Sequence, residues 1–127
     1  MSVTIIKKIS FDAAHFLPGH PGKCKATHGH HWVVEIGVVG KIDPDTGLVI
    51  DFSDLKSFLT DEVFEKYDHK LLNDFIDNPT AEKIAKRVEA LWISWSTDTH
   101  LKEDLSGTTL SLIRVWETET SYIELRP

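Results

Sequence analysis

Residues 28–40 read HGHHWVVEIGVVG, and this alternating segment is the strongest structural signal in the 127-residue chain. Its large apolar side chains recur at every second position, which is the period of a β-strand with one buried face. These side chains are Trp32, Val34, Ile36 and Val38. The same alternation puts His28 and His30 on one side, because residues i and i+2 of a strand point the same way. The segment therefore predicts a strand with an apolar end and a histidine-bearing end.

Three further strands are expected around this one. Residues 3–15 alternate and are rich in β-branched side chains, which is typical of a strand. The segment 16–27 between the two strands holds two prolines and two glycines and is predicted to be an ordered loop. Near the C-terminal end, two more strands are predicted over residues 108–117 and 120–126.

The middle of the chain changes to helical spacing. After turn residues at 43–47 and an extended segment over 48–52, Ser53 is predicted to cap a first helix. Its apolar residues Leu55, Phe58, Leu59 and Val63 follow the helical period. Thr80 is predicted to cap a second helix. The apolar stripe of that helix is Ile84, Ala85, Val88, Leu91 and Trp92.

The order ββααββ predicts an α+β fold in a single domain over residues 1–127. Strands at both ends and helices in the middle favour a four-stranded antiparallel sheet with two helices on one face. The other face must meet water or another chain. Trp32, Trp116, Ile113 and Tyr122 favour another chain and therefore an oligomer, unless these side chains all pack beneath the helices.

Composition narrows the classes of partner and compartment. The chain has 14 Lys+Arg and 20 Asp+Glu, a formal net charge of −6, which argues against nucleic acid as the main partner. No uncharged apolar run approaches the roughly 20 residues that span a bilayer. Met1 leads into an alternating segment rather than an apolar signal core, so we expect no membrane partner. One cysteine cannot form an internal disulfide, and the expected location is cytoplasmic.

Three histidines are candidate metal ligands. His28 and His30 share one strand face with only a glycine between them. His15 ends the preceding strand and comes close to this pair if the two strands form a hairpin. Three neutral imidazoles with a vacant fourth position are typical of catalytic zinc, although histidine also suits copper, nickel and iron. The alternative is a set of surface or hydrogen-bonded core histidines.

Cys24 lies four residues before His28, between Lys23 and Lys25. It could be the fourth ligand and close a structural zinc site. It could instead stand beside the metal as a base or nucleophile, since nearby positive charge favours the thiolate. A third interpretation is a buried small apolar side chain. Spacing alone does not separate the first two.

Two other segments carry acid–base side chains. Asp68 precedes His69 and could fix its tautomer and support its protonated form, although such pairs are common in loops. Glu117 lies at the end of the third predicted strand. It could accept two hydrogen bonds from the edge of a guanine or pterin ring, or be an exposed turn acid. The histidines expected to face solvent or to bond locally are His20, His31 and His100.

Six segments together resemble the 6-pyruvoyl-tetrahydropterin synthase / 6-carboxytetrahydropterin synthase family. They run in family order from residue 11 to residue 118 and so cover nearly the whole chain. Any one motif is weak, whereas six in order are specific. The segments are F-D-A-A-H at 11–15, C-x-x-x-H-G-H at 24–30, G-L-V-I-D-F at 47–52, D-H-K-x-L-N at 68–73, N-P-T-A-E at 78–82 and V-W-E-T at 115–118.

The resemblance implies a tunnelling fold (T-fold), in which ββααββ subunits join their sheets into a barrel. The implied assembly is a homohexamer, a dimer of trimers with active sites at subunit interfaces. The resemblance also implies that Zn²⁺ is held by His15, His28 and His30, with a fourth position left open for substrate oxygens.

The same resemblance implies roles for five further residues. Cys24 is implied as the proton acceptor rather than a fourth ligand. Asp68 and His69 are implied as a proton-relay pair. Glu117 is implied as a catalytic residue that anchors the pterin edge, and Thr80 as a residue of the pterin pocket.

The implied activity is that of a zinc-dependent lyase acting on 7,8-dihydroneopterin triphosphate. The three residues between Cys24 and His28 resemble the branch that forms 6-carboxy-5,6,7,8-tetrahydropterin, acetaldehyde and triphosphate, on the route to queuosine and other 7-deazaguanine nucleosides. The alternative branch forms 6-pyruvoyl-tetrahydropterin by eliminating triphosphate without cleaving the side chain. Two non-enzymatic alternatives are a zinc-stabilised assembly domain and a pterin-binding module.

Overall fold

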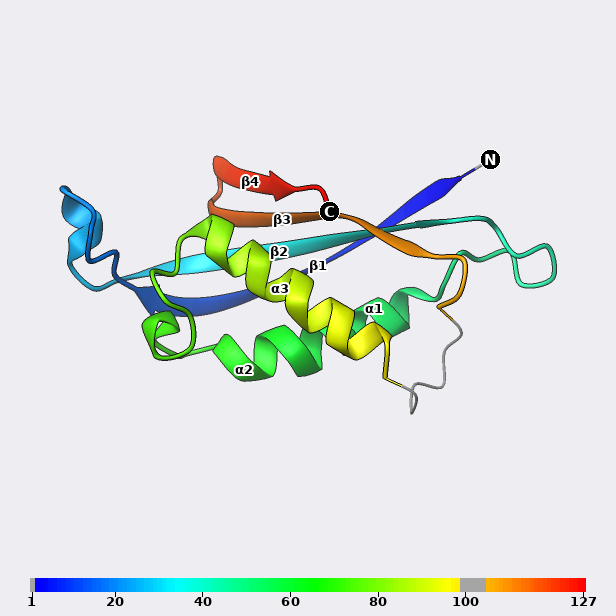
Figure 1. Ribbon diagram of the computed structural model, residues 1–127, viewed down its shortest axis with the longest axis horizontal. Helices are drawn as coiled ribbons and strands as arrows, with labels where there is room; N and C mark the ends of the chain where they lie inside the picture. Colours follow the sequence, from blue (N-terminus) through cyan, green and yellow to red (C-terminus); the bar gives the residue numbers. More distant parts are fainter. Residues whose placement is uncertain (1, 99–104) are drawn as a thin grey trace.

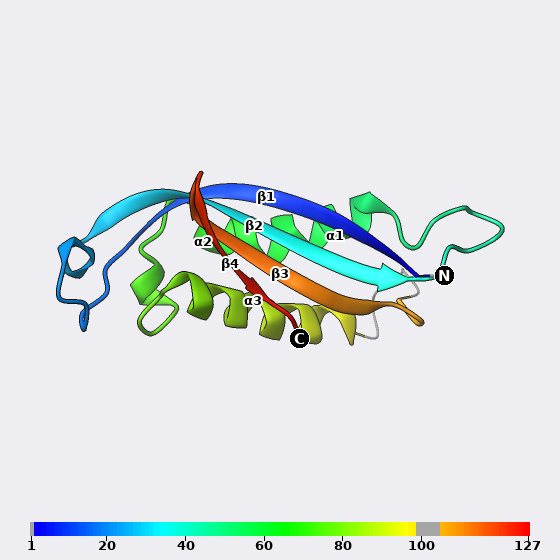
Figure 2. The ribbon, with the colours of Figure 1, turned by 90° about the horizontal axis from the view of Figure 1, so that it is seen from above.

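The computed structural model describes residues 2–98 and 105–127 of the chain. Within these ranges, four strands form one antiparallel sheet in the order β1-β2-β3-β4. The strands are β1 (Val3–His15), β2 (His28–Gly40), β3 (Thr109–Thr118) and β4 (Ser121–Leu125). In the part described, the helices lie on one face of this sheet, as two perpendicular views show (Figure 1 and Figure 2). The predicted α+β architecture is confirmed.

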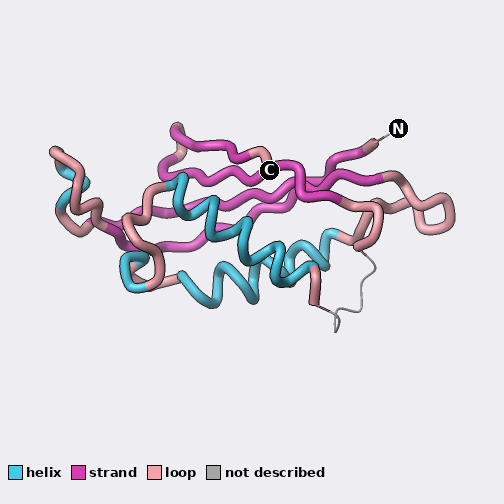
Figure 3. Tube along the Cα trace, viewed as in Figure 1, coloured by secondary structure: helices cyan, strands magenta, loops and turns pink. Residues whose placement is uncertain are grey.

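The helical layer consists of two segments that cross beneath the sheet (Figure 3). The first runs without a break through α1 (Phe52–Phe58), a π-helical stretch (Leu59–Phe64) and α2 (Glu65–Tyr67). The second is α3 (Ala81–Ser96). Short 3₁₀ turns cover Lys23–Lys25 and Leu72–Asp74. None of the helices described is long and apolar enough to cross a membrane.

The first helical segment turns one line of side chains towards the core. Side chains four positions apart lie on the same face of a helix. Leu59, Val63 and Tyr67 are accordingly all buried in the core. The segment therefore stops at a buried tyrosine, and Asp68 and His69 follow directly at its end.

The predicted strand bounds hold well. The strands over 3–15 and 28–40 are confirmed at both ends, and the two C-terminal strands each begin one residue later than predicted. Alternation is a reliable guide here because one face of the sheet is buried and the other is not.

The start of the first helix was predicted wrongly. Ser53 is not the cap, because Asp51 takes that position and its carboxylate accepts the Ser53 N–H at 2.8 Å. The extended segment over 48–52 is correspondingly one residue too long, since Phe52 begins α1. The cap of the second helix is confirmed: Thr80 Oγ1 accepts the Lys83 N–H at 3.1 Å.

The aromatic and apolar side chains expected on the uncovered face divide between the two faces. Trp32 and Ile113 are fully buried in the core beneath the helices, so the prediction is wrong for them. Trp32 has the same strand parity as Val34, and both therefore face the helices. Trp116 and Tyr122 lie as cross-strand partners, with ring centroids 4.2 Å apart, and Tyr122 is 49% exposed.

Two phenylalanines of α1 allow a matched test of this packing. Phe58 is fully buried and its ring contacts the rings of Trp92 and Trp95 on α3, at centroid distances of 5.0 and 5.3 Å. Phe52 on the same helix is 55% exposed. We expect Phe58→Ala to lower the free energy of unfolding by about 3–5 kcal/mol, because it opens a cavity between the helices. Phe52→Ala should change it by about 0.5 kcal/mol or less. Urea denaturation measures both, and equal losses would contradict this core.

Candidate metal centre

Three histidine side chains meet where β1 ends and β2 begins. His15 and His28 are direct cross-strand partners in the antiparallel register, and His30 lies two residues further along β2. One nitrogen from each ring lies within 4.8 Å of the other two. The predicted hairpin therefore brings His15 to the His28–His30 pair, as the sequence suggested.

The tautomers of two of these rings are fixed by backbone carbonyls. His15 Nδ1 lies 2.8 Å from the Pro79 carbonyl oxygen, and His28 Nδ1 lies 2.8 Å from the Ala26 carbonyl oxygen. A carbonyl only accepts hydrogen bonds, so each Nδ1 must carry the proton. In the neutral rings, both Nε2 atoms then hold lone pairs. These two atoms face each other at 3.0 Å, an arrangement that suits a cation bound by both.

His30 completes the group with a nitrogen that lacks a partner. Its Nε2 atom is buried and has no hydrogen bond within the described residues. Burial lowers the pKa of His30, and the neighbouring His15 and His28 lower it further, while Glu117 opposes the shift. Glu117 Oε1 lies 3.6 Å from His30 Nε2. The shift favours a neutral imidazole, which is the form that binds metals.

Trp32 supports the group from the core side. Its ring meets the rings of His15 and His30 edge-on, at centroid distances of 5.0 and 5.3 Å. Trp32 Nε1 donates to the Ala13 carbonyl oxygen at 3.2 Å, so this buried polar atom is satisfied. His15 itself is fully buried. Two of the three imidazoles thus pack against a buried aromatic ring.

The donor set fits a zinc ion. Three neutral nitrogen ligands, two of them with a second ring nitrogen bonded to a carbonyl, match the first and second shells of a catalytic zinc site. The structure brings no cysteine into the three-histidine group, among the residues described. The arrangement can therefore hold a divalent cation and leave a coordination position open.

Asp68 and His69 form a dyad at the end of α2. His69 Nδ1 donates to Asp68 Oδ2 at 2.7 Å, and the Asp12 N–H donates to the other oxygen, Oδ1, at 3.0 Å. The His69 N–H returns a bond of 2.6 Å to the Asp12 carbonyl. His69 has a positive φ of 59°, which this turn imposes. The dyad is thereby fixed to β1 near the metal centre.

Electrostatics separate the pKa values of the dyad. The hydrogen bond and charge of Asp68 raise the pKa of His69 above its ordinary 6.5. The Asp12 N–H, followed by His69, lowers the pKa of Asp68. His69 lines a pocket of about 640 Å³ that also includes His30 and Lys70. An imidazole here can hold or release a proton close to the histidine group.

Glu117 lines a second pocket, of about 530 Å³, together with His30, Val33 and Trp116. The strand end places its carboxylate beside an apolar and aromatic wall. The two pockets share Gly29, His30 and His31. The three-histidine group therefore borders two pockets through His30.

Two predicted site residues lie apart from this centre. Cys24 is half-buried in the 3₁₀ turn of a loop that extends beyond the ends of β1 and β2 (Figure 1 and Figure 2). Thr80 uses its hydroxyl to cap α3 and lines a smaller pocket of about 290 Å³ with His20. The roles implied for both stay predictions.

His31 faces away from the metal centre, as predicted, and its Nδ1 lies 2.8 Å from Asp12 Oδ1. Predicted His100 lies outside the described residues. The carbonyl groups of Pro79 and Ala26 were not predicted, because a backbone acceptor leaves no signal in residue type. The Asp12–His31 pair could have been found from the hairpin register.

The chain is similar to one protein family and to individual known proteins. The family model described as 6-pyruvoyl tetrahydropterin synthase matches residues 4–127. A 6-carboxy-5,6,7,8-tetrahydropterin synthase from Haemophilus influenzae is 34% identical over 136 residues, covering 94% of this chain and 96% of that protein. A dihydroneopterin monophosphate aldolase from Pyrococcus furiosus is 38% identical over 125 residues, covering 98% of each.

A solved structure supports the fold assignment. The structure of Caenorhabditis elegans 6-pyruvoyl tetrahydropterin synthase matches with a TM-score of 0.81 and 25% identity, covering 100% of this chain and 96% of that one. The ββααββ subunit of the tunnelling fold expected from the sequence is confirmed.

The raised pKa of His69 gives a testable pH dependence. Protonation is favoured in the folded state, so the dyad stabilises the fold below the ordinary pKa of 6.5, and this contribution is lost as pH rises through the folded pKa. We expect Asp68→Asn to shift the pKa of His69 down towards 6.5. NMR titration of the His69 ring protons measures this.

The matched control is Asp12→Asn, because Asp12 makes only the smallest contribution to the raised pKa of His69. That variant should leave the titration nearly unchanged. An Asp68→Asn protein in which His69 titrates as in the unmodified chain would show that the dyad does not control this group.

Proposed function

The chain belongs to the 6-pyruvoyl tetrahydropterin synthase family, and from that premise we propose that it is a zinc-dependent 6-carboxy-5,6,7,8-tetrahydropterin synthase. In this proposal it converts 7,8-dihydroneopterin triphosphate to 6-carboxytetrahydropterin, acetaldehyde and triphosphate, in the biosynthesis of queuosine and other 7-deazaguanine nucleosides. The observation that carries the proposal is the 3.0 Å approach of the His15 and His28 Nε2 atoms beside the buried His30 Nε2, which has no hydrogen bond within the described residues. The similarity to the Haemophilus influenzae enzyme supports the product.

His15, His28 and His30 are the proposed zinc ligands. A zinc ion held there would supply electrostatic stabilisation to negative charge that develops on the substrate's side-chain oxygens. The carbonyl groups behind His15 and His28 keep both rings in the tautomer that leaves Nε2 free. The site is therefore preorganised rather than assembled by the ion.

The remaining chemistry is proton transfer and substrate orientation. Cys24 is the proposed acceptor of a carbon-bound proton from the side chain. His69, oriented by Asp68 at 2.7 Å, is proposed to deliver or accept a proton on the other side. Glu117 would accept the ring N–H and NH₂ of the pterin in the pocket that it lines with Trp116. Thr80 is proposed as a further contact to the pterin.

The proposed assembly is a cytoplasmic homohexamer, a dimer of trimers, in which one copy completes the site of another. Residues 1–127 would form one domain of it. The loop that carries Cys24 extends beyond the sheet, which suits a contribution across a subunit boundary. The stacked Trp116 and Tyr122 on the uncovered face suit burial in such an assembly.

Two other reactions on related substrates compete with this proposal. A 6-pyruvoyl-tetrahydropterin synthase would eliminate triphosphate and keep the carbon side chain. A dihydroneopterin monophosphate aldolase is favoured by the 38% identity to the Pyrococcus furiosus protein over 98% of both chains. A non-enzymatic alternative to the proposed synthase is a non-catalytic zinc-stabilised domain.

Product analysis separates these candidates. We expect zinc-loaded protein incubated with 7,8-dihydroneopterin triphosphate to release triphosphate and acetaldehyde together, with a product of the mass of 6-carboxytetrahydropterin. Triphosphate without acetaldehyde would support the pyruvoyl-forming reaction. Turnover of 7,8-dihydroneopterin monophosphate in preference to the triphosphate would support the aldolase.

The same assay tests the role of Cys24 with the variant Cys24→Ala. This variant should keep its zinc, because the thiol lies outside the three-histidine group, and should lose about 10²–10⁴-fold in turnover as expected for a missing acid–base group. Loss of zinc and of folding together would instead indicate a structural site that Cys24 closes.

A further inference from the structure

We propose that Asn73 is a positioning residue that holds the base of the Cys24 loop and sets Cys24 relative to the Asp68–His69 dyad. The catalytic part of this inference rests on the proposed function. The structural part concerns only how residues 16–27 are held, and it can be tested without turnover.

Asn73 makes a two-point contact with a single backbone residue. The Phe16 N–H donates to Asn73 Oδ1 at 3.0 Å, and Asn73 Nδ2 donates to the Phe16 carbonyl oxygen at 2.8 Å. These residues are 57 positions apart in sequence, and both bonds are partly buried. A carboxamide presents one acceptor and one donor side by side, whereas a carboxylate offers acceptors only. The side chain therefore matches the backbone of Phe16 in both directions.

The contact between Asn73 and Phe16 is linked to Cys24 through Leu17. Phe16 directly follows His15, and the next residue, Leu17, donates its N–H to the Cys24 carbonyl oxygen at 2.7 Å. The two arms of the loop are thus joined at the point that Asn73 holds. Apart from the bond between Ala26 and His28, the other hydrogen bonds of the described loop connect its own residues.

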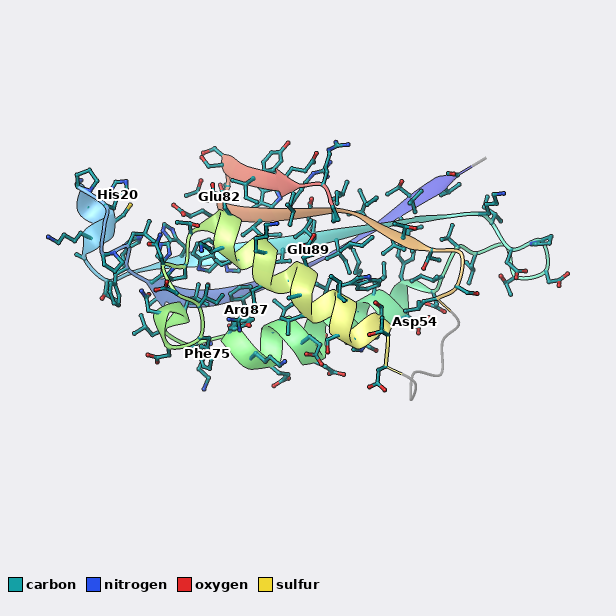
Figure 4. The ribbon with its side chains drawn as sticks, in the orientation of Figure 1. His20, Asp54, Phe75, Glu82, Arg87 and Glu89 are labelled. Atoms are coloured by element: carbon teal, nitrogen blue, oxygen red, sulfur yellow. The ribbon has the colours of Figure 1, made fainter. Side chains whose placement is uncertain are left out.

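On the other side, Asn73 belongs to a firmly packed segment. It lies in the 3₁₀ turn Leu72–Asp74, and the Leu72 side chain is buried in the core. The turn is followed by Phe75, whose carbonyl oxygen accepts a 2.8 Å bond from Arg87 Nη2 on α3 (Figure 4). The two bonds between Asn73 and Phe16, called the clamp from here on, therefore connect the loop to the helical layer.

The same strand end also holds the dyad. The Ala14 N–H donates to the Lys70 carbonyl oxygen at 3.0 Å, and Ala14 forms a β-bridge with Leu71. Asp12 and Ala14 of β1, together with Phe16 just after this strand, thus bind the segment 68–73 along its length. The proposed base and the proposed relay are positioned on one short piece of backbone, and Asn73 is the side chain that completes this connection. Figure 4 shows His20 in this loop, and His20 lines a pocket with Thr80, the cap of α3.

The test compares Asn73→Asp with Asp74→Asn. The first variant keeps an acceptor for the Phe16 N–H but puts an oxygen against the Phe16 carbonyl where a donor is needed. The second changes the neighbouring exposed side chain of the same turn and touches neither bond. Asn73→Ser is a second, smaller variant in case Asn73→Asp does not fold.

The direct readout is alkylation of the thiol by iodoacetamide. The chain has one cysteine, so the rate for the whole protein reports on Cys24 alone. We expect Asn73→Asp to speed alkylation roughly 2- to 10-fold, the range set by losing one hydrogen bond that restrains the loop. With substrate, kcat should fall by up to about 10²-fold at near-unchanged KM and zinc content. Asp74→Asn should match the unmodified protein in all four measurements.

Two results would overturn the inference. One is a folded Asn73→Asp or Asn73→Ser protein whose alkylation rate and kcat equal those of the unmodified chain. The other is a uniform loss of zinc, activity and thermal stability, which would mean that Asn73 only supports the fold. Faster alkylation in a protein whose unmodified form has no activity on the triphosphate would support the clamp and count against the proposed function.

Discussion

The structure depends on how the end of β1 and the start of β2 accommodate three imidazoles, of which His15 is fully buried and the other two are half-buried. His15 and His28 face each other through their Nε2 atoms at 3.0 Å, while their Nδ1 atoms donate to the carbonyl groups of Pro79 and Ala26. Two lone pairs this close repel each other unless a cation lies between them. Each carbonyl comes from a different part of the chain. The hairpin register, the entry into α3 and the end of the Cys24 loop must therefore all be correct for this geometry to form.

The fold then arranges the remaining groups around this constraint. The first helical segment ends with α2 at Tyr67, and the dyad that follows is bonded to Asp12 on β1. On the opposite side of His30, β3 presents Glu117. An Asp–His pair and a carboxylate thus border one candidate metal centre from two pockets. This division of roles is what a reaction needs when it removes a carbon-bound proton from a side chain while holding a flat ring.

Much of this was predictable from the sequence, and the failures have physical reasons. Alternation fixed the bounds of the first two strands, and strand geometry together with a hairpin brought His15 to His28 and His30. The cap at Asp51 was missed because Phe52 fits a strand as well as a helix. The faces of Trp32 and Ile113 depend on which parity the helices cover, which no single strand reveals. The backbone carbonyls behind the histidines and the bonds between Asn73 and Phe16 required the tertiary structure. They join residues 57 or more positions apart, or their acceptor is a backbone carbonyl that residue type does not reveal.

The central claim is that the three histidines form an open metal centre, and zinc K-edge X-ray absorption tests it most directly. The account predicts a first shell of light atoms only, with histidine nitrogens at about 2.0–2.1 Å and one further oxygen. A zinc–sulfur shell at about 2.3 Å would contradict it, because Cys24 would then close the coordination sphere and the centre would be structural.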